Sequence, residues 1–274
     1  MDAAQPISSP QNPRIKQLVR LNNRRQRDQA QRTLVEGVRE VGRALARGIV
    51  PLEAYVCSDL AQGAEAMAVI DTLTHLAATG QTQLFTIPPS LFQKIAYRGQ
   101  SGGMVLVVPY QTRSFNDLVL GVLPFLTVID GAEKPGNIGA ILRTADGAGV
   151  DALLLAGDEQ ARTDLHNPNV IRASLGAAFT VPSVAAPTAA IIAWLRARQI
   201  AIVATTPEAS ALYTAVSFKG PVAIVMGSEA FGLGVDWLAA ADEQVRIPMA
   251  GTVDSLNLSV ATALLLYEVV RQRG

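Results

Sequence analysis

The second half of the sequence alternates short, almost uninterrupted apolar runs with segments of helical spacing. The runs cover residues 125–130, 152–156, 181–184, 200–205, 222–226 and 245–247. Runs this short and this apolar are typical of strands in a parallel sheet that helices cover on both faces. We therefore expect an α/β fold with a mostly parallel sheet. Ligands of such sheets bind beyond the carboxyl ends of the strands, so a site is expected in the loops that follow them.

The first hundred residues predict a smaller α/β unit. A basic helical stretch and a second helix at about 35–47 are followed by strands at 52–57, 83–87 and 102–109 and helices at 61–78 and 89–97. Pro109 and the polar residues up to Asn116 interrupt the apolar pattern, which is typical of a linker. We expect two domains, residues 1–113 and 114–274.

Charge is distributed unevenly along a chain whose formal net charge is zero. Residues 1–47 hold ten Lys/Arg against four acids, a local charge of +6. The remaining 13 Lys/Arg face 19 acids, a charge of −6. Such asymmetry is typical of a chain with one polyanion-binding end.

Other residue counts exclude several classes of protein. Cys57 is alone, so no intramolecular disulfide can form and a reducing compartment is expected. His75 and His166 are far apart with no further ligand nearby, which argues against a metal site. The amino terminus has no signal-peptide pattern, and the apolar run at 260–267 is too short to cross a bilayer. We expect a cytoplasmic protein with no membrane segment.

Three loops that follow predicted strands carry polar residues at the start of a helix or next to glycine. Taken singly, each has an ordinary structural interpretation as a surface charge, a turn or a helix cap. Because all three leave carboxyl ends of strands, we expect them to meet at one edge of the sheet. The residues, loop by loop, are Asn137 and Arg143, Gly227 and Glu229, and Ser255 and Asn257.

Neither common nucleotide-binding signature is present. The stretch Gly136-Asn-Ile-Gly139 does not match the Gly-x-Gly-x-x-Gly pattern of dinucleotide-binding folds. The turn Gly227-Ser-Glu lacks the lysine of a Walker A loop. Both observations argue against a nicotinamide cofactor and against a nucleoside triphosphate.

Together the three loops resemble the three motifs of the SpoU/TrmH-type RNA 2′-O-ribose methyltransferases of the SPOUT superfamily. The similarity covers about residues 118–274 and includes the small-residue stretch Arg172-Ala-Ser174-Leu-Gly176-Ala. Residues 8–108 resemble the L30e-like substrate-binding domain that precedes many of these enzymes. The matching motifs are Asn137 with Arg143, Gly227-Ser-Glu229-x-x-Gly232-Leu, and Ile247-Pro-Met-x-Gly followed by Ser255-Leu-Asn257-Leu-Ser-Val-Ala.

The resemblance implies a trefoil knot in the catalytic domain, bound S-adenosylmethionine and a homodimer with active sites at the subunit interface. The reaction it implies is methyl transfer to a ribose 2′-hydroxyl of RNA. The cofactor contacts it implies are Thr205, Gly227, Ile247, Met249 and Leu256.

Two roles remain open for Arg143. The resemblance implies that it accepts the hydroxyl proton with help from Ser255. A guanidinium has a pKa above about 12 and no free lone pair, so the alternative is that its forked donors hold the target phosphate or ribose. Asn137 and Asn257 are expected to hold substrate and loop geometry, with Glu229 in support.

The basic amino-terminal segment is expected to bind the RNA, through Arg14, Lys16, Arg24, Arg25 and Arg27. Removing residues 1–113 should then weaken RNA binding and leave cofactor binding intact. The front domain favours 23S ribosomal RNA over transfer RNA as substrate. A tRNA methyltransferase, a non-catalytic ribosome-assembly factor and an antibiotic-resistance methyltransferase remain alternatives.

Overall fold

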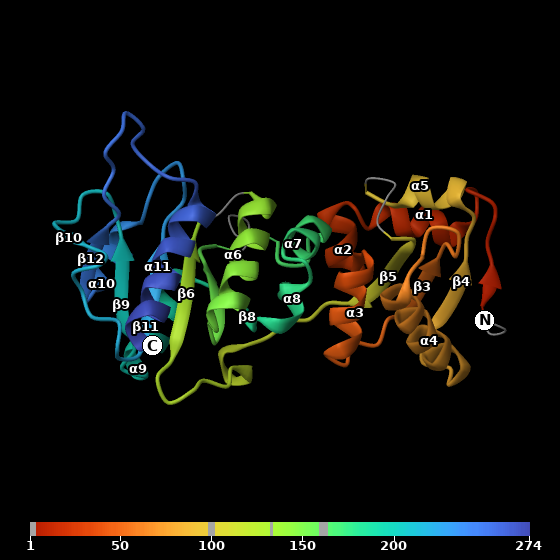
Figure 1. Cartoon of the computed structure of the whole chain (residues 1–274), viewed down its shortest axis with the longest axis horizontal. Helices are drawn as coiled ribbons and strands as arrows, with labels where there is room; N and C mark the ends of the chain where they lie inside the picture. The colour runs from red at the N-terminus through yellow and green to blue at the C-terminus, as the bar shows by residue number, and fades with distance from the viewer. Residues whose placement is uncertain (1–3, 98–101, 132–133, 159–163) are drawn as a thin grey trace. The chain divides into compact units, whose positions relative to one another are not determined.

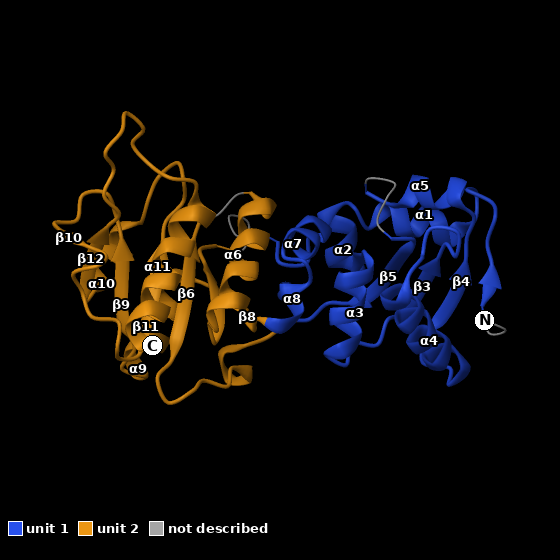
Figure 2. Cartoon of the chain, in the orientation of Figure 1, with its two compact units in different colours: residues 1–111, 164–180 blue, residues 112–163, 181–274 orange. Residues whose placement is uncertain are grey.

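The computed structural model describes residues 4–97, 102–131, 134–158 and 164–274. The chain forms two compact units (Figure 2). Unit 1 consists of Met1–Gln111 and Asp164–Thr180, and unit 2 consists of Thr112–Thr163 and Val181–Gly274. The expected boundary after residue 113 lies two residues beyond the first boundary of this division, which also assigns residues 164–180 to unit 1.

Unit 1 contains a mixed sheet with the strand order β1-β4-β3-β5-β2. β1, β3 and β4 run parallel to one another, whereas β5 is antiparallel to both β2 and β3. Successive side chains of a strand point to opposite faces, so Ala54 lies in one core and Tyr55 in another. The strands are β1 (Gln5–Pro6), β2 (Arg32–Glu36), β3 (Glu53–Val56), β4 (Gln83–Thr86) and β5 (Met104–Pro109).

Helices cover both faces of the unit 1 sheet (Figure 1). The buried residues of α3 and α4 share a core with Ala54 and Leu106, and those of α1 and α5 share the opposite core with Tyr55 and Phe85. The helices are α1 (Pro13–Arg20), α2 (Arg24–Ala30), α3 (Val38–Ala46), α4 (Ala64–Ala78) and α5 (Pro89–Ile95).

The expected helix at 35–47 is wrong in its first turn, where the structure forms the end of β2. Leu34 and Val35 are buried on opposite faces of the sheet, in the two different cores. Gly37, at φ +108°, then turns the chain and donates its N–H to Met104 O at 3.3 Å. Sheet pairing with β5 decides the structure of this segment, and a local apolar pattern cannot reveal such a distant partner.

Residues 164–180 fold as two short helices that complete unit 1. They are α7 (Pro168–Ala173) and α8 (Ala177–Thr180), and the segment includes the small-residue stretch that begins at Arg172. The break falls at Leu175 and Gly176, which have φ angles of 53° and 84° and therefore leave the helical region. Ile171 and Phe179 are buried in the core that contains α3 and α4.

Unit 2 contains a parallel sheet of seven strands within the described residues, in the order β10-β12-β9-β11-β6-β7-β8. Every pairing in it is parallel, as the apolar runs predict. The expectation of two α/β domains, the second with a mostly parallel sheet, is confirmed. The strands are β6 (Phe125–Asp130), β7 (Ala152–Ala156), β8 (Ser183–Ala186), β9 (Ala201–Thr205), β10 (Ala211–Leu212), β11 (Val222–Met226) and β12 (Glu243–Arg246).

Helices also cover both faces of this sheet. α6 and α11 lie side by side on one face (Figure 1), and α9 and α10 share a core on the other through Trp194 and Trp237. None of the described helices is long and apolar enough to cross a membrane. The helices are η1 (Phe115–Asp117, a 3₁₀ turn), α6 (Pro135–Ala148), α9 (Thr188–Ala197), α10 (Val235–Ala240) and α11 (Leu258–Arg273).

Strand register brings four loops to one edge of the unit 2 sheet. Met226, the last residue of β11, is paired with Ile129 on one side and with Thr205 on the other. Val245 of β12 is in turn paired with Thr205. The loops after β6, β9, β11 and β12 therefore leave together. β11 lies between β6 and β9, where the strand order reverses, and ligands of parallel sheets bind at such a point.

Candidate active site

A pocket of about 470 Å³ opens at this edge, between the loops after β9, β11 and β12. Its volume falls within the roughly 300–1,000 Å³ of small-molecule sites. Apolar side chains form much of its wall, including Leu233, Leu238 and Ala261. The lining also contains all five residues expected to contact the cofactor, Thr205, Gly227, Ile247, Met249 and Leu256.

The pocket also presents polar groups. The Thr205 hydroxyl is buried and has no hydrogen-bond partner among the described residues. A buried hydroxyl without a partner is costly, and the residue that carries it lines the pocket. The carboxylates of Glu208 and Asp254 also belong to the lining. A hydrogen bond from Thr206 lowers the pKa of Glu208, which keeps that group anionic.

Two glycines shape the loop that follows β11. The N–H of Ser228 donates to Gly232 O at 3.1 Å, and the N–H of Gly232 donates back to Ser228 O at 3.0 Å. Gly232 has a φ of +66°, which favours glycine. A Cβ added at Gly227 would lie 2.2 Å from the carbonyl carbon of Gly232, so a larger residue there would force the loop open. This tight turn contains Glu229.

The carboxylate of Glu229 gathers groups from three loops. Its Oε1 accepts hydrogen bonds from Asn137 Nδ2 at 3.1 Å, Asn257 Nδ2 at 2.8 Å and the N–H of Leu258 at 3.2 Å. Asn257 Nδ2 also donates to Asn137 Oδ1 at 3.1 Å. Asn137 lies in the first turn of α6 and Asn257 caps α11. The structure thus brings together the three loops on which the sequence interpretation depends.

Lys134 joins the same cluster, although the sequence interpretation assigned it no role. Its ammonium lies 2.7 Å from Glu229 Oε2. The hydrogen bond from Lys134 is the largest of several influences that lower the pKa of Glu229. Both residues line a second cavity of about 220 Å³, which shares Ser228, Glu229 and Leu258 with the larger pocket. The available signal in the sequence was the position of Lys134 directly before Pro135, three residues ahead of the motif residue Asn137.

Ser255 and Arg143 occupy different places relative to this cluster. Ser255 is exposed and lines the larger pocket. Arg143 is exposed on α6, six residues after Asn137 and therefore about 9 Å further along the helix. It is absent from the lining of both cavities. Within one chain, then, Asn137, Glu229 and Ser255 line the cavities and Asn257 is hydrogen-bonded to two of them, whereas Arg143 lines neither cavity.

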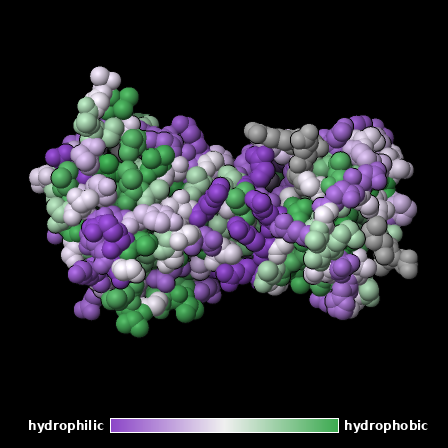
Figure 3. Space-filling model, in the orientation of Figure 1, coloured by the Kyte–Doolittle hydropathy of each residue, from purple (hydrophilic) through white to green (hydrophobic). Residues whose placement is uncertain are grey.

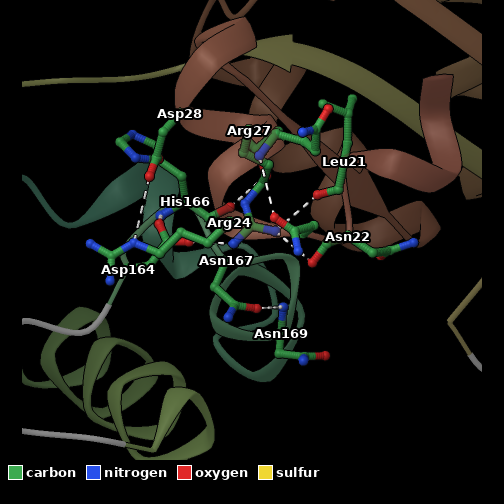
Figure 4. Close-up of polar contacts among 12 residues, drawn as sticks. Leu21, Asn22, Arg24, Arg27, Asp28, Asp164, His166, Asn167 and Asn169 are labelled. Carbon is green, nitrogen blue, oxygen red and sulfur yellow. Dashed lines mark hydrogen bonds and ion pairs between the residues drawn. The ribbon is translucent and has the colours of Figure 1, made fainter. Parts of the chain in front are cut away.

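Arg27, one of the residues expected to contact RNA, is buried inside unit 1 with only 1% of its surface exposed (Figure 4). It forms an ion pair with Asp164 and donates to the carbonyls of Leu21 and Asn22, each at 2.9 Å. Asp164 comes from the segment that completes unit 1, a partner that charge counting along the sequence cannot reveal. The prediction that Arg27 contacts RNA is therefore wrong. Its side chain is buried and stabilises unit 1.

The other basic residues expected to contact RNA are accessible to different degrees. Arg14 pairs with Glu53 and lies 4.9 Å from the centre of the Phe85 ring. Lys16, Arg24 and Arg25 are all exposed, and Arg24 lies 3.6 Å from Asp28. A shallow groove of about 780 Å³ crosses this surface and contains Arg25 together with a basic residue outside the predicted set. The residues that line the groove are Val19, Arg20, Asn22, Asn23, Arg25 and Gln26.

Similarity to known proteins extends from family models to individual relatives. The SpoU rRNA Methylase family matches residues 124–267, and the MRM3-like substrate binding domain matches residues 12–105. The chain is 31% identical to the 23S rRNA (uridine(2479)-2′-O)-methyltransferase of Streptomyces viridochromogenes, over 92% of this chain and 87% of that protein. It is 43% identical to the 23S rRNA (guanosine-2′-O-)-methyltransferase RlmB of Pectobacterium atrosepticum over 153 residues. That match spans 56% of this chain and 62% of RlmB.

Solved structures show the same similarity over nearly the whole chain. A crystal structure of an RNA 2′-O ribose methyltransferase superposes with a TM-score of 0.85 at 40% identity, covering 98% of this chain and 99% of that one. The AdoMet-bound rRNA methyltransferase of Sinorhizobium meliloti superposes with a TM-score of 0.87 at 28% identity, covering 98% of both chains. The resemblance inferred from the three motifs is confirmed, and the chain belongs to the SpoU rRNA methylase family.

Proposed function

We propose that this protein methylates a ribose 2′-hydroxyl of 23S ribosomal RNA, using S-adenosylmethionine as the methyl donor. The observation that carries the proposal is the hydrogen-bonded cluster of Asn137, Glu229 and Asn257 beside a pocket lined by all five expected cofactor contacts. Relatives named as 23S rRNA 2′-O-methyltransferases support both the reaction and the choice of RNA.

The larger pocket suits S-adenosylmethionine in volume and in chemistry. Its apolar wall offers a surface for the adenine ring, and Glu208 and Asp254 offer acceptors for hydroxyl and ammonium groups. The unpaired hydroxyl of Thr205 gains a partner when a ligand binds there. Bound in this pocket, S-adenosylmethionine supplies a methyl group that its sulfonium already activates. The protein then has to align the ribose and remove the hydroxyl proton.

In the proposal, the cluster aligns the ribose, Ser255 serves in proton removal, and Arg143 serves in one of these two tasks. Glu229 holds Asn137 and Asn257 together, so both amides are fixed next to the pocket before substrate arrives. Alignment of this kind contributes up to about 7–11 kcal/mol of barrier lowering in well-oriented reactions. Ser255 lies at the pocket wall, in position to assist proton removal. Arg143 either holds the phosphate or ribose through its forked donors or accepts the proton.

In the proposal, a second copy of the chain completes the active site. Val260, Leu264 and Tyr267 follow one another at helical spacing on α11 and are 49%, 38% and 51% exposed. Hydrophobic side chains gather on the face of unit 2 where α11 lies (Figure 3). An exposed apolar stripe of this kind is typical of a surface that another protein covers. Arg143 lies on α6, which packs along α11, so a homodimer through this face places Arg143 at the subunit interface.

In the proposal, unit 1 recognises the RNA. The enzyme acts in the cytoplasm, where ribosomal RNA is found. The match to a substrate-binding domain supports this role of unit 1. The exposed Lys16 and the groove that contains Arg20 and Arg25 provide positive charge for the RNA backbone. Only 5% of the residues are aromatic, so phosphate contacts are expected to contribute more than base stacking.

The proposal is tested by incubating the purified full chain with radiolabelled S-adenosylmethionine and either 23S ribosomal RNA or a tRNA pool. We expect label in 23S ribosomal RNA, at a nucleotide that then resists alkaline cleavage because its 2′-oxygen is methylated. Arg143→Lys keeps the charge but changes the fork and the basicity, and is expected to lose most turnover. Wild-type turnover in that variant contradicts both roles of Arg143, and label in tRNA alone contradicts the choice of substrate. Light scattering of the same sample measures whether it is a dimer.

A further inference from the structure

We propose that Lys134 is a substrate-binding residue that contacts the phosphate next to the target ribose. This inference rests on the proposed function and adds to it a residue that the motif interpretation did not include. It is carried by the position of Lys134 at the rim of the smaller cavity, by its ion pair with Glu229 and by its exposure.

The local structure gives Lys134 no stabilising role in its own helix. It occupies the N-cap of α6, and its side chain makes no capping hydrogen bond. Asn, Asp, Ser or Thr at such a position stabilises a helix by about 1 kcal/mol relative to a residue that cannot cap. A cation beside the positive end of a helix is unfavourable as well. Residues that break a local rule in this way are expected at functional sites.

Glu229 holds the Lys134 ammonium next to the Asn137–Asn257 pair. The ammonium of Lys134 donates a hydrogen bond to Glu229 Oε2 at 2.7 Å. The Lys134 side chain is nevertheless 71% exposed. A lysine with this exposure can turn toward an anion that enters the cavity while it keeps its bond to the carboxylate. Pro135 restricts the backbone of Lys134, so the stem of the side chain starts from a fixed place.

The two cavities lie next to each other and match the two substrates of the reaction. They share Ser228, Glu229 and Leu258, so a ligand in the smaller cavity adjoins one in the larger pocket. If the larger pocket holds the methyl donor, the smaller one is the place for the acceptor nucleotide. The 2′-hydroxyl and the 3′-phosphate sit on neighbouring carbons of a ribose. A nucleotide that presents its hydroxyl to the donor therefore brings a phosphate with it.

Lys134 is the group in the smaller cavity that can attract that phosphate. Glu229 and Lys134 are the charged residues in its described lining, and their charges offset each other. Glu229 already accepts four hydrogen bonds, from Lys134, Asn137, Asn257 and the N–H of Leu258. The exposed ammonium is then the stronger electrostatic feature for an incoming anion. Contact with one phosphate releases counterions, which gives the inference a measurable signature.

The test compares Lys134→Met with Lys134→Arg in the full chain, using the 23S ribosomal RNA that the wild-type protein methylates. We expect Lys134→Met to weaken RNA binding roughly tenfold. The slope of log affinity against log salt concentration should also become shallower by about 0.7–0.9. Lys134→Arg should keep the wild-type slope. The affinity for S-adenosylmethionine, measured by calorimetry without RNA, should stay within about twofold of wild type in both variants.

Lys219→Met is the matched control, because Lys219 is exposed and precedes β11, whereas Glu229 follows it. This variant should retain the RNA affinity and the salt slope of the wild type. An unchanged slope in Lys134→Met contradicts the inference. A parallel loss of cofactor affinity contradicts it too, because Lys134 would then only shape the Glu229 loop. A wild-type chain that methylates no RNA would instead contradict the proposed function itself.

Discussion

At the scale of single residues, the buried hydroxyl of Thr205 is expected to have different effects on folding stability and on cofactor binding. The free protein gives Thr205 Oγ1 no partner among the described residues, so the hydroxyl costs folding free energy. Thr205 is also one of the residues that line the cofactor pocket. Thr127 has an equally unpaired hydroxyl in the middle of β6, outside that lining. The two threonines therefore form a natural pair for comparison.

Thr205→Val should leave the melting temperature unchanged or slightly higher, because it replaces an unpaired buried hydroxyl with a methyl group of similar size. It should weaken the binding of S-adenosylmethionine by about 1 kcal/mol, which is roughly fivefold. Calorimetric titration and thermal unfolding measure the two effects. Thr127→Val is expected to preserve cofactor affinity. A Thr205→Val variant with wild-type affinity, or a Thr127→Val variant with reduced affinity, contradicts this prediction.

Site residues were predicted from the sequence where they form a motif with neighbouring residues, and were missed where they do not. Asn137, Glu229 and Asn257 belong to recognisable motifs, and the structure places them in one cluster. Arg27 and Lys134 have no such motif, and their surroundings depend on Asp164 and Glu229, which are 137 and 95 residues away. The sequence shows that a cation is present at each position. Only folding shows that one is buried in an ion pair and the other exposed beside a cavity.

At the scale of elements, apolar runs located the central strands well, and β6, β7 and β11 begin and end where the sequence predicts. β2 was missed because its pairing with β5, from Arg32↔Pro109 to Glu36↔Val105, lies beyond any local window. The knot in the carboxy-terminal segment stays a prediction. The segment at 164–166 was likewise unassigned, and within unit 1 it packs on Tyr110 through stacked rings. The rings of His166 and Tyr110 are 3.6 Å apart and nearly parallel.

His166 makes this junction sensitive to pH. Burial lowers its pKa, while Asp164 and Asp28 oppose the shift and Arg27 adds to it. The folded state thus favours neutral His166, whereas the unfolded chain takes up a proton near pH 6.5. Below about pH 6.5 the unfolded state binds more protons, so the free energy of unfolding should fall as the pH decreases.

His166→Phe keeps an aromatic ring for Tyr110 and removes this titration. Denaturant unfolding between about pH 7.5 and about pH 5 should show a smaller loss of stability in the variant than in wild type. His75→Gln removes the only other histidine and is expected to retain the wild-type dependence. Equal pH dependence in His166→Phe and the wild type would rule out His166 as the titrating group.

At the scale of the whole molecule, the two units are not consecutive pieces of chain. Unit 1 takes residues 164–180 from the middle of the sequence that otherwise builds unit 2. Ile171 and Phe179 lie in its core, and Asp164 pairs with the buried Arg27. A chain that lacks residues 1–113 therefore leaves an apolar segment and a carboxylate without their partners. Its RNA affinity would report damage to the fold as well as the loss of an RNA-binding surface.

Charge substitution on the surface of unit 1 avoids this difficulty. Arg20→Gln with Arg25→Gln changes two exposed residues of the groove and leaves every core residue in place. We expect weaker binding of 23S ribosomal RNA and a salt slope shallower by about 0.7–0.9 for each phosphate that the variant no longer neutralises. Cofactor affinity should not change. Arg47→Gln, an exposed residue after α3, is the control and should bind like wild type. Wild-type affinity and slope in the double variant would show that the RNA binds to another surface.

The chain without residues 1–113 should bind a hydrophobic dye that the double variant does not, because only the truncation exposes Ile171 and Phe179.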